Sequence, residues 1–257
     1  MSQASRLGSF KHLTTIGRTY VWQLKNAPTA AAFFFESGLS VDADGAPKAY
    51  GPHGLAGTLD NLGNAGHPGN WWGILKDRTG QPVVQNGIAP KQPNSGFYIS
   101  ITSLINFGLD DADVRKYADA TRIPYIALPP AYFRGTRLTI GDIALLINTN
   151  NGKYTFSLFA DTKHNPTLGE ISICASAALG GPTDARRGSL PKGIVSLVFP
   201  DSGIGQGSIL DADTIRVVGR GHLHHFSMFR DKDSTLPKAF PEYPLFATAL
   251  VKAGYVT

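Results

Sequence analysis

The chain has 257 residues, enough for one large domain or two small ones, and its 42% apolar and 17% charged residues are typical of a globular protein. Its formal net charge of +5 comes from scattered basic residues, so the sequence predicts no nucleic-acid groove. The single cysteine, Cys174, excludes an intrachain disulfide.

The N-terminal sequence MSQASRLGSFKHL lacks the apolar core of a secretory signal peptide. The longest apolar run, residues 30–35, is too short to span a bilayer, so we expect no membrane span. We therefore expect a protein that is cytoplasmic as synthesised, or one that is exported by a non-classical or dedicated secretion route.

The first third of the chain predicts one early strand region and one long loop. Residues 1–28 have little periodicity, and we interpret them as an N-terminal arm that leads into a single domain over residues 29–257. Residues 30–41 (AAAFFFESGLSV) are apolar and aromatic, as in a buried strand or strand pair. Residues 51–96 are rich in Gly, Asn, Pro and His, which indicates a long ordered loop region of the kind that often carries function.

The middle of the chain alternates between strand and turn signals. Residues 97–104 (FYISITSL) alternate like a strand, and residues 110–119 start with acidic side chains, as a short helix does. Asn150-Asn151-Gly152 is typical of a tight hairpin. Four further strands are expected at residues 123–128, 142–148, 153–160 and 193–199.

The last third of the chain predicts short helices and a hairpin. Residues 171–179 (ISICASAAL) indicate a short buried helix that ends at Gly180-Gly181, with Cys174 as a small buried apolar residue. Residues 214–219 and 222–229 suit a late hairpin, and residues 240–253 suit a closing helix. The whole order predicts a mainly β fold with short helices, built as a closed or semi-closed barrel with long loop insertions.

Asp161 and Glu170 are the most informative polar pair. Asp161 ends a predicted strand, a polar loop follows, and Glu170 opens the predicted helix. Hydrolysis of a glycosidic bond needs two carboxyl groups that face each other across that bond, and a short loop between the two residues suits this arrangement. The alternative is structural: Thr167 and Glu170 also form a capping box, and Asp161 then only accepts hydrogen bonds from the loop. The spacing alone leaves both interpretations open.

Residues 156–179 (FSLFADTKHNPTLGEISICASAAL) resemble the signature of glycoside hydrolase family 75, the fungal-type chitosanases. The matching positions are Asp161-Thr162, Gly169-Glu170 and Ser172-Ile173. Residues 40–45 resemble the Asp-x-Asp-Gly element of that family, and residues 192–203 resemble its late strand. The resemblance covers residues 30–50 and 120–205, and the chain looks like a bacterial-type member without a signal peptide.

This resemblance implies a double-psi β-barrel-like core and an inverting mechanism with Asp161 and Glu170 as the catalytic pair. We expect Glu170 to donate the proton and Asp161 to activate water, because a helix start and apolar neighbours can adjust the pKa of Glu170. The reverse assignment stays open. The implied substrate is chitosan, cleaved within the chain, with no cofactor. The chain departs from the family in its missing signal peptide, its single cysteine and its 51–96 region.

The resemblance and the residue types also suggest a set of substrate-binding residues. Asp42 and Asp44 form either a second acidic wall of the cleft, which binds the protonated amines of glucosamine, or only a turn. An EF-hand calcium loop is excluded, because Pro47 and His53 occupy the positions at which that loop needs Gly and Glu. The aromatic side chains of Trp71, Trp72 and Tyr98 either stack on sugar rings or pack in the core. The set comprises Asp42, Asp44, Trp71, Trp72, Tyr98, Thr162 and Ser172.

His222, His224 and His225 form an H-x-H-H pattern on a predicted strand. A zinc site requires a third ligand, and no Cys or Glu stands at a matching spacing, so we expect no metal.

Three functions remain open at this stage. The first is a chitosanase. The second is a hydrolase of the anionic peptidoglycan glycan, favoured by the basic chain and the missing signal peptide; such an antibacterial effector implies an immunity protein as partner. The third is a non-catalytic carbohydrate-binding barrel.

Overall fold

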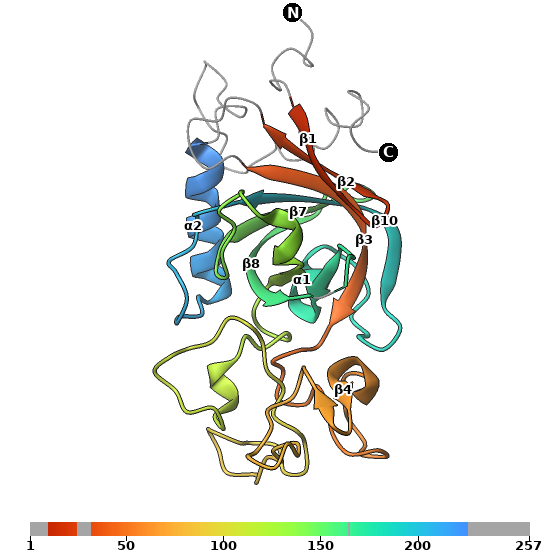
Figure 1. Cartoon of the computed structure of the whole chain (residues 1–257), viewed down its shortest axis with the longest axis vertical. Coiled ribbons are helices and arrows are strands. Elements are labelled where there is room, and N and C mark those ends of the chain that lie inside the picture. Colours follow the sequence, from red (N-terminus) through yellow and green to blue (C-terminus); the bar gives the residue numbers. More distant parts are fainter. Residues whose placement is uncertain (1–9, 25–31, 164, 226–257) are drawn as a thin grey trace, which may run out of the picture.

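The structure, a computed structural model, describes residues 10–24, 32–163 and 165–225. A β-barrel forms one half of the molecule, and a loop-rich region lies beneath it in the view of Figure 1. No helix in these three segments is both long and apolar enough to cross a membrane.

Six strands close into the barrel. Going around it, β3 pairs with β10, then come β7, β8, β6 and β9, and β9 pairs back with β3. The barrel-like, mainly β core expected from the sequence is confirmed. The bounds are β3 Phe33–Asp42, β10 Ser189–Phe199, β7 Ile143–Asn148, β8 Tyr154–Thr162, β6 Tyr125–Leu128 and β9 Glu170–Ser172.

Continuous runs of apolar residues explain why the central strands of the barrel are buried on both faces. Every residue of β7 (IALLIN) is buried, as is every residue of β6 (YIAL), because these strands have packed layers on both faces. β7 and β8 form the predicted antiparallel hairpin, in which Gly152 has a φ of +74°, a value that favours glycine. The four strands predicted from residues 123 to 199 are therefore confirmed.

The interpretation of residues 1–28 as an arm is wrong for residues 10–24. These form β1 (Phe10–Ile16) and β2 (Thr19–Leu24), an antiparallel hairpin whose second strand pairs with β3. In β2, Val21 is buried and Tyr20 is exposed, so the alternation of a half-buried strand is present but short. Residues 1–9 and 25–28 lie outside the described residues.

The chain between β3 and β6 forms the loop-rich region, where two predictions are wrong. Residues 97–104 make only isolated bridges, such as Ile74 with Ser100, and residues 110–119 contain only a short 3-10 turn. The carboxylate of Asp113 accepts a hydrogen bond from the backbone N–H of Arg115, which stabilises that turn without a full helix. The short elements here are η2 Leu62–Ala65, β4 Gly66–His67, β5 Asn70–Trp71 and η3 Val114–Lys116; η4 Pro130–Phe133 follows β6.

The predicted buried helix is present as α1 (Ile173–Ala178), but it starts later than expected. Its N-cap is Ser172, whose hydroxyl accepts a hydrogen bond from the N–H of Ala175. Glu170 lies in strand β9 and not at the third helical position. The capping-box interpretation of Glu170 is therefore wrong. Cys174 is half-buried, not fully buried.

A helix, α2 (Ala212–His225), replaces most of the predicted late hairpin and runs along the barrel (Figure 1). Ile215 and Leu223 are buried eight positions apart, a helical spacing. Between them, Gly219 lies so close to Phe156 of β8 that a Cβ atom at this position would come within 2.3 Å of the ring. This close packing explains the glycine at position 219 of the helix. Residues 226–229 and the predicted helix at 240–253 lie outside the described residues.

Candidate functional site

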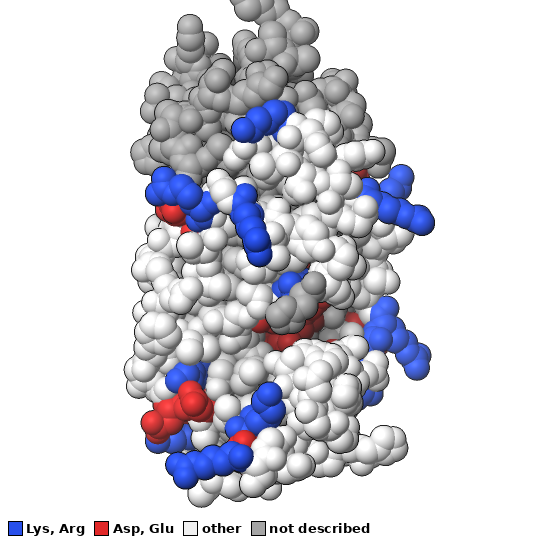
Figure 2. All heavy atoms as spheres, viewed as in Figure 1, with Lys and Arg blue, Asp and Glu red and all other residues white. Residues whose placement is uncertain are grey.

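A cavity of about 910 Å³ opens between the ends of β3 and β8 and the loop-rich region. Figure 2 shows acidic side chains gathered in a hollow on this face of the molecule. The titratable residues that line the cavity are Asp42, Asp44, Tyr50, Asp60, Asp161, Lys163, Glu170, Arg186 and Arg187.

The strand register brings Asp161 and Glu170 to the same place. Ala127 of β6 pairs with Asp161 on one side and with Glu170 on the other. The register of β6 with β8 shifts between Ile126 and Ala127, so the pairing sets the distance and not the face: two strand spacings separate the two backbones by about 10 Å. The two carboxyl groups flank one space, since both line the cavity.

Asp161 is fixed by a residue from the loop-rich region. Its Oδ1 accepts hydrogen bonds from the backbone N–H of Ser103 (2.9 Å) and from the Ser103 hydroxyl (2.8 Å). The same hydroxyl lies 2.8 Å from the hydroxyl of Thr162. Burial raises the pKa of Asp161 to about 6, against the opposing effect of the Ser103 hydrogen bonds.

Glu170 has a different electrostatic environment. Its Oε2 forms an ion pair with the ammonium group of Lys163, whose side chain is only 11% exposed. The ammonium group is thus in direct contact with this carboxylate, whereas no cationic side chain among the described residues is paired with Asp161. The site thus holds one carboxyl group whose proton is retained up to about pH 6 and one that is paired with a cation.

Asp42 and Asp44 form both the turn and the acidic wall that the sequence left as alternatives. Asp42 Oδ1 accepts a hydrogen bond from the N–H of Asp44 (2.9 Å), and both residues line the cavity. Burial raises the pKa of both carboxyl groups well above the usual range; the charge of Glu170 adds to this for Asp42, and the charge of Asp42 adds to it for Asp44.

The aromatic pair divides between core and cavity. Trp72 is 51% exposed and lines the cavity, where its indole N–H donates a hydrogen bond to the carbonyl of Asn64 (2.9 Å). Trp71 is buried in the core, and Tyr98 is half-buried and does not line this cavity. Stacking on sugar rings remains a prediction for Trp72 only, because the other two rings are placed elsewhere.

Thr162 lines the cavity as expected, and Ser172 does not. Ser172 is fully buried, and its hydroxyl accepts hydrogen bonds from the N–H groups of Tyr125 (3.0 Å) and Ala175. Its position in the signature segment is explained by helix capping, so the prediction that it binds substrate is wrong. The predicted histidine strand is part of α2, where the ring of His222 stacks on Phe199.

Three residues of the site were not predicted from the sequence: Ser103, Lys163 and Asp60. Lys163 stands two positions after Asp161, which for an extended chain indicates the same face, so a signal for it was present. Ser103 and Asp60 come from loop segments that no motif marks. A scan against protein-family models finds no family that matches the chain, and a search of curated proteins finds no matching relative.

Proposed function

We propose that this protein is a glycoside hydrolase that cleaves a β-1,4-linked amino-sugar polymer within the chain, with chitosan as the substrate. The observation that supports this most directly is the pairing of Asp161 and Glu170 with the same residue, Ala127, at the wall of one cavity. In inverting enzymes the two carboxyl groups lie about 6.5–9.5 Å apart, which leaves room for a water molecule between them. A separation of two strand spacings, about 10 Å between the backbones, is compatible with that arrangement.

In the proposed reaction, Asp161 is the general acid and Glu170 is the general base. The protonated Asp161 donates its proton to the glycosidic oxygen as the bond from C1 to that oxygen breaks. Glu170 takes a proton from a water molecule, whose oxygen attacks C1 from the opposite face. This assignment reverses the sequence-based expectation, because burial favours the protonated form of Asp161 while Lys163 pairs with Glu170.

The local charge of the cavity favours chitosan over peptidoglycan. The cavity is lined by more carboxyl groups than cationic side chains: Asp42, Asp44, Asp60, Asp161 and Glu170 against Lys163, Arg186 and Arg187, with Lys163 paired to Glu170. A concave acidic surface attracts the ammonium groups of glucosamine units and repels an anionic polymer. Salt screens the field of the net positive charge over about 10 Å, so this charge affects a polymer in the cavity less than the carboxyl groups that line it.

Turnover of purified protein on chitosan and on purified peptidoglycan, run in parallel, tests this proposal. We expect new reducing ends from chitosan, with the α-anomer formed first from the β-linked polymer, as NMR detects. Cleavage of peptidoglycan but not of chitosan would mean that peptidoglycan is the substrate. Cleavage of neither polymer would favour a non-catalytic carbohydrate-binding barrel.

The acid assignment predicts how activity depends on pH. The value of kcat/KM on chitosan oligosaccharides is expected to fall about tenfold per pH unit above pH 6, because Asp161 then loses the proton that it must donate. Binding of the same oligosaccharides to the Glu170→Gln variant, measured across this range, corrects for titration of the substrate amines. A corrected rate that stays constant from pH 6 to pH 8 would contradict the role of Asp161 as acid.

A further inference from the structure

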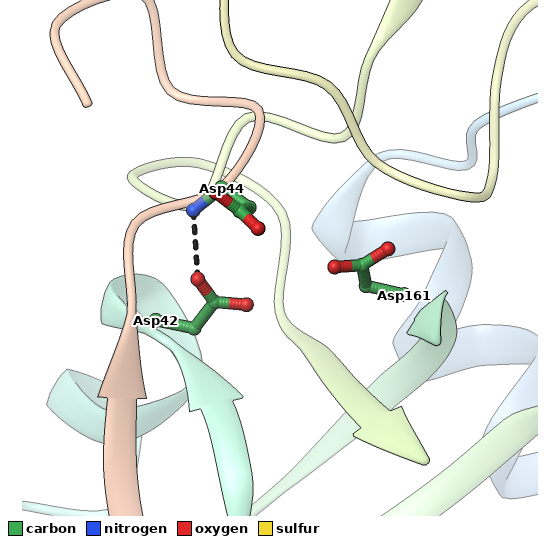
Figure 3. A group of neighbouring side chains, drawn as sticks. All are labelled: Asp42, Asp44 and Asp161. Carbon is green, nitrogen blue, oxygen red and sulfur yellow. Dashed lines mark hydrogen bonds between the residues drawn. The ribbon is translucent and has the colours of Figure 1, made fainter. Parts of the chain in front are cut away.

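Three carboxylates converge at the inner end of the cavity. Asp42 and Asp44 follow the end of β3, and Asp161 lies near the end of β8. One oxygen from each carboxylate lies within 4.8 Å of the others, and Figure 3 shows the three groups facing a common space.

One oxygen in this group is buried without a partner. Asp42 is only 5% exposed, and its Oδ2 has no hydrogen-bond donor among the described residues. Its Oδ1 is already bonded to the N–H of Asp44, so the second oxygen is directed towards Asp161 (Figure 3). A buried carboxylate oxygen without a donor is unfavourable unless a cation or another donor occupies the space in front of it.

Among the described residues, no cationic side chain is paired with this group. In the part of the chain that the structure describes, no Lys or Arg forms an ion pair with Asp42, Asp44 or Asp161; Lys163 pairs with Glu170. A buried carboxyl group is paired with a cationic side chain, takes up a proton, or coordinates a metal. The first option is not seen among the described residues, and a bound cation would favour the ionised form of the three groups over the protonated form.

The carboxylates are also held in place from behind. Asp44 Oδ1 accepts a hydrogen bond from the hydroxyl of Ser100 (3.2 Å), and Asp161 Oδ1 accepts two from Ser103. Donors behind the ligands orient them towards an ion, as they do in protein metal sites.

We propose that Asp42, Asp44 and Asp161 bind a calcium ion. Three carboxylates and no nitrogen or sulfur ligand suit a hard cation. Calcium–oxygen bonds of about 2.3–2.6 Å allow two ligands up to about 5 Å apart, which accommodates the observed limit of 4.8 Å. Magnesium, with bonds of about 2.0–2.1 Å, requires ligands within about 4.2 Å and therefore a contraction of the group.

Asp161 belongs both to this calcium site and to the proposed catalytic pair. A carboxylate that coordinates calcium is not available to donate a proton, so calcium and hydrolysis are expected to compete for it. This consequence rests on the proposed function, whereas calcium binding itself does not.

Thermal unfolding of the full chain with calcium chloride, magnesium chloride or EGTA tests the proposal. At calcium concentrations about 100-fold above Kd, we expect Tm to rise by roughly 5–10 °C, with a smaller rise in magnesium. The rise should disappear in Asp42→Asn and in Asp44→Asn. It should persist in Asp60→Asn, which removes a buried carboxylate of the same cavity outside this group.

Each variant is compared with itself in EGTA, so a lower basal stability does not obscure the result. Calorimetric titration of the unaltered chain with calcium gives a second measurement, with an expected stoichiometry of one ion per chain. An absent calcium response, a response only to magnesium, or an equal response in Asp44→Asn would overturn the proposal. These measurements contain no glycan, so their outcome is independent of whether the protein hydrolyses chitosan.

Discussion

Replacement of Asp161 by Asn is expected to lower kcat/KM on chitosan by about 10²–10⁴-fold, and replacement of Glu170 by Gln by a similar factor. Each amide has nearly the shape of the acid that it replaces, but it neither donates nor accepts the proton that the reaction requires. The Ser103 donors that bind Asp161 can also bind the amide oxygen, so the side chain is expected to keep its place. Initial rates in EGTA, with thermal unfolding of each variant, measure the effect.

Asp110→Asn is the matched control, because its side chain is 80% exposed and its ion pair with Lys91 lies on the surface. We expect its rate to equal that of the unaltered chain. The double variant should lose little more than either single one, since two groups that act in one step are not additive. If either amide variant retains full activity while folded, the proposed catalytic pair is wrong.

Substrates with different leaving groups distinguish the general acid from the general base. An aryl glycoside with a nitrophenolate leaving group needs little protonation, so Asp161→Asn should lose far less activity on it than on chitosan. Glu170→Gln should lose the same factor on both substrates, because activation of water is still required. If Glu170→Gln instead keeps most of its activity on the aryl glycoside while Asp161→Asn does not, Glu170 is the acid, as expected from the sequence.

The barrel strands were predictable because burial leaves a pattern in the chain. β7 and the first residues of β3 are covered on both faces, which requires runs such as IALLI and FFF. The β1–β2 hairpin and α2 were missed for the opposite reason. Each buries only part of its surface, and in α2 two glycines, Gly219 and Gly221, weaken the helical signal. Of these, only Gly219 packs closely on Phe156.

The catalytic candidates were placed in the cavity as expected, but their surroundings were not predictable. Ser103 is 58 positions from Asp161, and its contact depends on how the loop-rich region folds back on the barrel. Trp71 and Trp72 are adjacent and chemically identical, so only the local bend after the η2 turn decides which ring is buried. Spacing therefore identifies residues within one segment, and tertiary packing decides what surrounds them.

Truncation of Phe35 to Ala is expected to lower the free energy of unfolding by about 3–5 kcal/mol. Phe35 is fully buried in β3, between Val21 of β2 and Ser196 of β10, and the substitution leaves a void that this close-packed layer cannot fill. Domains are stable by only about 5–15 kcal/mol, so the variant loses a large share of its stability.

Chemical denaturation monitored by tryptophan fluorescence measures this loss, with Phe107→Ala as the control because the same substitution there removes a ring that is 65% exposed. We expect the control to change stability by about 0.5 kcal/mol or less. Equal losses in the two variants would mean that β3 is not at the centre of the core. Because Asp42 ends this strand and Asp44 follows it, a loosened β3 should also weaken calcium binding, which links the packing of the barrel to the geometry of the site.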